Sequence, residues 1–139
     1  MSDMTIKTIV AALFLAAGTG AFLTMMSLMG RPGRGGDTGK ARKVHKVFGW
    51  LYVALLVPLA YLGIGFVGDM GDGMPTRAVF HVVLAGTLIA LLLVKVLIVR
   101  FFKGFVKNAP ALGMALFVLT IVIFLVTAGF FLVQTAAAN

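Results

Sequence analysis

Cysteine is absent from this 139-residue chain, and so is glutamate. Without cysteine the chain has no disulfide, thiolate metal site, iron–sulfur cluster or covalently attached haem c. Its four acidic residues are all aspartates, and no carboxylate pair or Ser/His/Asp set at a common depth supports hydrolytic catalysis. Any metal centre must therefore use histidine, methionine or oxygen ligands.

Charge is also scarce, at 12% of residues against 61% that are hydrophobic, and the mean hydropathy is +1.11. Soluble domains are about a quarter charged. About 20 apolar residues are needed for a helix to cross a hydrocarbon core of roughly 30 Å, and four runs of this kind are present. They cover residues 6–28, 47–67, 78–99 and 112–133. We predict an all-α integral membrane protein, a single transmembrane domain folded as a four-helix up-and-down bundle in contact with the lipid bilayer.

The basic residues, which give a net charge of +8, gather in two of the predicted connections. The first is a glycine-rich basic loop, residues 30–43, and the second contains Arg100, Lys103 and Lys107. Loops rich in lysine and arginine stay cytoplasmic, which predicts both termini on the outer side of the cytoplasmic (inner) membrane. Basic residues beside spans also attract anionic lipid headgroups, so this charge requires no nucleic-acid partner.

Small residues occupy the middle of the first predicted span, in the order Ala16-Ala17-Gly18-Thr19-Gly20-Ala21. Small side chains allow helix backbones to approach closely in lipid. We expect this face of the helix to pack on a neighbouring helix.

The chain has two histidines, His45 at the start of the second span and His81 at the start of the third. An ionisable residue in a span is a functional candidate. One interpretation is haem ligation through an imidazole nitrogen. The other is an interfacial histidine bonded to a carbonyl, a lipid phosphate or a loop carboxylate. Because the two spans are antiparallel, the rise of a helix places the imidazoles about 25 Å apart along the membrane normal, too far to share one metal.

Each haem iron would need a second axial ligand. In a homodimer each histidine meets its own copy across the two-fold axis. Methionine is the other source, although methionine in an apolar bundle usually fills gaps. The candidates are Met25, Met26, Met29 and Met114 at the depth of His45, and Met70 and Met74 on the His81 side.

Three basic residues are candidates to contact haem propionates: Arg42, Lys43 and Lys95. Arg42 and Lys43 already have a topological explanation as loop charges. Lys95 lies close enough to the end of its span to extend its ammonium to the interface.

Two segments of the central spans resemble the helix starts of small transmembrane b-type cytochromes. They are Lys43-Val-His45-Lys-Val-Phe-Gly49-Trp-Leu-Tyr52 and Phe80-His81-Val-Val-Leu-Ala85. The resemblance implies a four-helix core with two haem b groups on opposite sides of the membrane. It also implies electron transfer between a quinol pool or small reductant and a partner redox protein, as in an electron-transfer subunit of an oxidoreductase. Such cores usually supply four histidines from one chain; the two here favour a homodimer or a subunit of a larger membrane complex.

Two other classes of protein are compatible with four apolar helices. A transporter normally carries a carboxylate or a polar pair near the bilayer middle, and these spans have no Asp, Glu, Asn or Arg at mid-depth. A cofactor-free structural or assembly subunit of a larger respiratory or redox complex needs no site at all. That subunit is the alternative to the haem protein.

Overall fold

The computed structural model describes residues 3–30 and 38–138, and all regular structure in these residues is helical. The prediction of an all-α protein is confirmed. In chain order the elements are α1 (Asp3–Met29), α2 (Thr38–Met70), the 3₁₀ turn η1 (Gly71–Gly73), α3 (Thr76–Arg100), the 3₁₀ segment η2 (Lys103–Asn108), α4 (Ala109–Phe124), the π-helical segment η3 (Leu125–Gly129) and α5 (Phe130–Ala137).

Four helical segments of the described chain are long and apolar enough to cross a membrane, and they contain the four predicted runs. The second is longer than expected: α2 begins at Thr38, so residues 38–43, expected in the basic loop, are helical. Lysine, alanine and arginine favour helix, whereas hydropathy detects only the apolar part of it. Residues 31–37 of the predicted loop lie outside the described residues.

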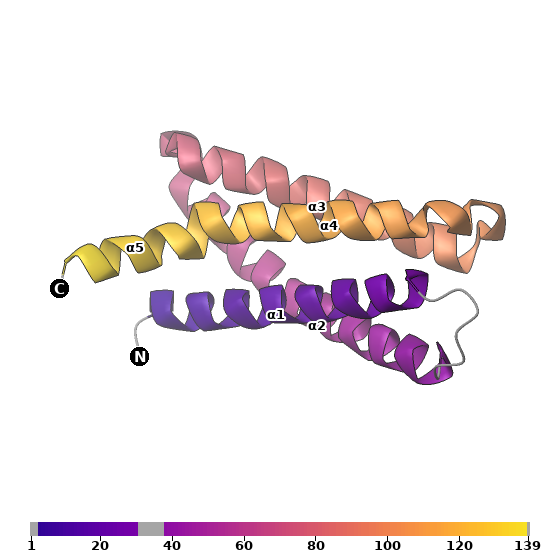
Figure 1. Ribbon diagram of the computed structural model, residues 1–139. Coiled ribbons are helices and arrows are strands. Elements are labelled where there is room, and N and C mark those ends of the chain that lie inside the picture. Colours follow the sequence, from indigo (N-terminus) through magenta and orange to yellow (C-terminus); the bar gives the residue numbers. More distant parts are fainter. Residues whose placement is uncertain (1–2, 31–37, 139) are drawn as a thin grey trace.

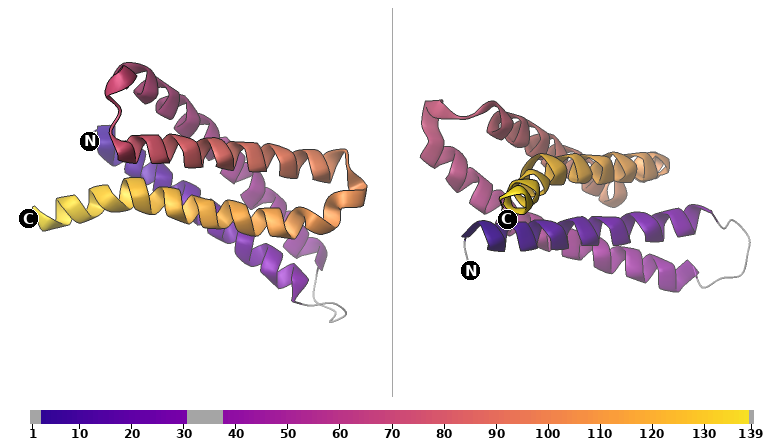
Figure 2. Two further views of the ribbon diagram at one scale, coloured as in Figure 1. Left: turned by 90° about the horizontal axis from the view of Figure 1, so that it is seen from above. Right: turned by 60° about the vertical axis from the view of Figure 1, so that its left-hand side comes forward.

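The helices run up and down in two antiparallel pairs, α1 with α2 and α3 with α4, and α4 also packs on α1 (Figure 1). The start of α1 and the end of α5 lie at the same end of the bundle (Figures 1 and 2). We call this the terminal end. The opposite end, formed by the last turn of α1, the start of α2, the end of α3 and η2, is called the basic end.

The centre of the bundle joins all four spans through a buried cluster: Phe14, Ala17, Tyr52, Leu88 and Leu116. The Tyr52 ring stacks on Phe14 with the centroids 4.2 Å apart. The Tyr52 hydroxyl lies 2.7 Å from Thr120 Oγ1, whose own proton is donated to the Leu116 carbonyl at 2.7 Å. Tyr52 is therefore the donor to Thr120, and the pair satisfies two hydroxyls that are buried in an apolar core.

Small residues bring α1 against α2, as predicted. A methyl group added at Gly20 would lie 2.6 Å from the Phe48 ring, and one added at Gly18 would lie 3.1 Å from the Tyr52 ring. The expectation that this patch packs on a neighbouring helix is confirmed. The second half of α2 diverges from α1 (Figure 2), and side chains there are exposed, Tyr61 to 78% and Ile64 to 74%.

Candidate functional site

The two histidines line two different hollows. His81 lines a large cavity near the terminal end, called the His81 cavity, and His45 lines a small pocket near the basic end, called the His45 pocket. The two imidazoles do not meet at one site, which agrees with the separation expected from helix geometry. Among the described residues no group of three or more His, Asp or Glu side chains forms a metal cluster.

The His81 cavity has a volume of about 390 Å³. This is within the range of roughly 300–1,000 Å³ typical of cofactor and small-molecule sites. All four spans contribute to its mostly apolar wall, which includes Phe14, Leu59, Gly63, Phe66, Leu88, Ile123, Phe124 and Phe131. The cavity exists because α2 diverges from α1 before α3 begins, so that the helices do not close against each other at this end (Figure 2).

The π-helical segment η3 forms part of the same wall through Thr127 and Ala128. Thr127 donates its hydroxyl proton to the Ile123 carbonyl at 2.7 Å and so presents no unpaired proton to the cavity. Turns of π-helix are rare and are frequently found at functional sites. Hydropathy does not distinguish them from α-helix, so this stretch was predicted only as part of the fourth apolar run.

Polar groups are few around the His81 cavity, and its charged residues are cations. His81 Nδ1 is buried and has no hydrogen-bond partner among the described residues. Arg77 lies one helical turn before His81, and its guanidinium carbon is 3.9 Å from the centre of the Phe130 ring. Lys7 and Met70 also line the cavity. An imidazole, a thioether and two cations therefore surround an apolar space.

The His45 pocket is much smaller, about 70 Å³. His45 Nδ1 lies 2.8 Å from the Ala21 carbonyl oxygen and 3.3 Å from Thr24 Oγ1. A carbonyl only accepts hydrogen bonds, so Nδ1 is the donor, and in a neutral imidazole the other ring nitrogen then has the lone pair. This is the carbonyl-bonded histidine of one interpretation, and it is also the orientation that second-shell carbonyls give to metal-ligating histidines.

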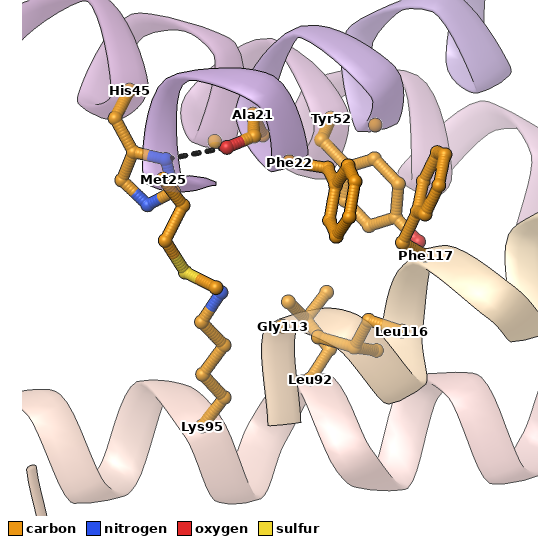
Figure 3. Close-up of a pocket in the computed structure, with 12 residues that line it drawn as sticks. Ala21, Phe22, Met25, His45, Tyr52, Leu92, Lys95, Gly113, Leu116 and Phe117 are labelled. Carbon is orange, nitrogen blue, oxygen red and sulfur yellow. Dashed lines mark hydrogen bonds between the residues drawn. The ribbon is translucent and has the colours of Figure 1, made fainter. Parts of the chain in front are cut away.

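Lys95 lies in the His45 pocket and does not extend away from the bundle. Its side chain runs from α3 toward Met25 and the His45 ring (Figure 3). A methyl group added at Gly113 would lie 3.1 Å from Lys95 Nζ and 3.1 Å from Met25 Cε. The missing side chain of Gly113 thus provides the space that the ammonium and the methionine methyl occupy.

The remaining predicted site residues are not brought to either histidine. Arg42, Lys43 and Met29 are exposed, and neither they nor Met74 line the two hollows. Arg77 and Lys7, which also line the His81 cavity, were not predicted from the sequence. Arg77 precedes His81 by four residues, a spacing that places two side chains on one face of a helix and was the available signal.

Comparison with known proteins gives one match. No curated protein and no solved structure is similar to the chain. A family model does match, and it covers residues 1–139. The chain therefore belongs to the family of unknown function DUF6529.

Proposed function

We propose that this protein is an integral membrane electron-transfer protein that binds haem b in the His81 cavity. The observation that carries the proposal is a histidine on the wall of an apolar cavity of about 390 Å³, with a buried Nδ1 that has no hydrogen-bond partner in the part of the chain that the structure describes. A haem site combines a large apolar space with an axial ligand, of which histidine is one kind, and cations near the porphyrin offset its two carboxylates. The residues around His81 supply all three kinds of group.

Each group has a distinct task. His81 would hold the iron, and Met70, which lines the same cavity, is the candidate for the second axial position in a single chain. Arg77 and Lys7 would offset the propionate charges in place of the predicted Arg42, Lys43 and Lys95. The apolar walls exclude water, and their composition and the axial ligands set the reduction potential. Haem b itself supplies reversible one-electron transfer, between a quinol or small reductant and a partner redox protein.

The predicted second haem, at His45, has weaker support. The hydrogen bond that His45 donates from Nδ1 is of the kind that orients a metal-ligating imidazole. However, the pocket of about 70 Å³, which Met25 and Lys95 already line, is far too small for a porphyrin. If His45 ligates a haem, the second half of that site must come from another copy of the chain. One haem per chain, at His81, is therefore the proposal.

We also propose in which membrane the chain lies and which of its ends faces the cytoplasm. Four apolar segments support insertion in a bilayer, and the basic end carries Lys40, Arg42, Lys43, Lys46, Arg100, Lys103 and Lys107. We place this end in the cytoplasm and both termini outside, in the cytoplasmic membrane. The His81 cavity then lies in the outer leaflet. A homodimer or a larger membrane complex would surround the exposed second half of α2.

Visible spectra of the full chain, purified in mild detergent after expression with haem supplied, test the proposal. We expect sharp α and β bands in the dithionite-reduced protein and about one haem per chain. His81→Ala should abolish these bands. His45→Ala is the matched control and should retain them. A colourless protein would refute haem binding and favour the cofactor-free assembly subunit, whereas bands lost only in His45→Ala would show that the wrong histidine was chosen.

A further inference from the structure

No carboxylate of residues 3–30 and 38–138 is paired with Lys95 inside the bundle. The residues that line the His45 pocket with it are apolar, apart from His45 and Tyr52. The described aspartates lie at the start of α1, at the end of α2 and in η1, all at the terminal end of the molecule. An ammonium in an apolar bundle is costly unless a counter-charge is close. Among the described residues, the chain does not supply that charge.

The surroundings of the pocket favour a negative ligand. Seven lysine and arginine residues of α2, α3 and η2 lie at the basic end, including Arg100, Lys103 and Lys107. Their combined field raises the local concentration of anions. Neighbouring positive charges also make an unpaired Lys95 ammonium less favourable, so both effects act in the same direction.

The size of the pocket selects the kind of anion. A cavity of roughly 10–15 Å³ is just large enough to hold one water molecule. The His45 pocket, at about 70 Å³, therefore admits a compact group of several atoms. The ammonium offers up to three donors to one such group. The remaining wall is apolar, with Phe22 and Phe117 stacked at a centroid distance of 4.3 Å. Such a wall suits a charged group attached to an apolar body.

We infer that the His45 pocket binds a phosphate group, with Lys95 as its principal donor and Gly113 as the residue that leaves room for the Lys95 ammonium. The source of the phosphate is the headgroup of an anionic lipid or the free ion. The site is separate from the His81 cavity and does not depend on haem binding. We therefore expect anionic lipid to remain bound to the protein through Lys95, in addition to the general attraction that the exposed lysines exert.

The test is native mass spectrometry of the full chain released from phosphatidylcholine nanodiscs that contain a minor fraction of phosphatidylglycerol. We expect the wild-type chain to retain phosphatidylglycerol in preference to phosphatidylcholine. Lys95→Met should weaken this binding about tenfold, the loss expected for one charge-assisted hydrogen bond. Lys103→Met, which removes the same charge from an exposed position at the same end, should weaken it far less.

Two further measurements separate the outcomes. Gly113→Ala keeps the charge but places a methyl group against Nζ, so it should also weaken binding; it provides a second variant if Lys95→Met unfolds. Inorganic phosphate that displaces the lipid indicates the free ion as a source, and failure to displace it indicates the lipid headgroup. Equal losses in Lys95→Met and Lys103→Met, or no preference for phosphatidylglycerol together with no phosphate binding, would overturn the inference.

Discussion

The hydrogen bond between Tyr52 and Thr120 connects α2 to α4 at the centre of the bundle, and its removal allows a quantitative test of the fold. Tyr52→Phe deletes the hydroxyl that donates to Thr120 Oγ1 at 2.7 Å and leaves the stacked ring in place. Side-chain hydrogen bonds between membrane helices contribute about 0.6 kcal/mol on average and up to about 1.7 kcal/mol. Because both partners are buried, we expect a loss of about 1 kcal/mol in the free energy of unfolding.

Thr120→Val should cost more than Tyr52→Phe, although it removes the same contact. It leaves the Tyr52 hydroxyl buried without an acceptor, which costs about 1–3 kcal/mol. The bond from Thr120 to the Leu116 carbonyl is internal to α4 and persists when the helices separate, so its loss largely cancels. The double variant has neither hydroxyl, and its loss should therefore be at least about 0.5 kcal/mol smaller than the sum of the single losses.

The assay is equilibrium unfolding of the full chain in mixed dodecylmaltoside and dodecyl sulfate micelles, followed by circular dichroism. Tyr61→Phe is the matched control, because Tyr61 is 78% exposed and should change the free energy of unfolding by less than about 0.3 kcal/mol. If Tyr52→Phe behaves like this control, or if the two single losses add without coupling, α2 and α4 do not meet through this bond and the packing described here is wrong.

Two other predictions concern packing and topology. Gly20→Ala should weaken the α1–α2 contact by about 1–3 kcal/mol in the same unfolding assay, since the new methyl group would meet the Phe48 ring at 2.6 Å. Gly65→Ala, whose methyl group meets nothing within 4 Å, should change stability little, and equal losses would contradict the close approach of the two helices. For topology, the chain has no native cysteine, so a single Asp72→Cys should react with an impermeant maleimide in intact cells. Lys103→Cys should react only after the membrane is opened, and the reverse pattern would refute the orientation.

Many residues of the candidate site could be predicted from the sequence, but their arrangement around a cavity could not. The sequence identified both histidines, placed Met25 at the depth of His45 and made Lys95 a candidate contact for haem propionates. It gave no reason to prefer His81. That preference depends on the divergence of α2 from α1, which opens a cavity of about 390 Å³ beside one histidine and leaves about 70 Å³ beside the other. The rotation and tilt of helices are set by side-chain packing between distant residues, which no local pattern records.

What the sequence determined by itself is the class of protein: all helix, four apolar segments, and a glycine face on α1 that packs against a neighbour. These properties depend on the length of apolar runs and on the need of each backbone group to be bonded within its own helix in lipid, both of which are local. Only the tertiary structure decided that Tyr52 meets Thr120, 68 residues away, that His45 meets the Ala21 carbonyl, 24 residues away, and that Lys95 lies inside the bundle. Each of these contacts joins different helices, so its formation depends on how the helices cross and not on any pattern within one of them.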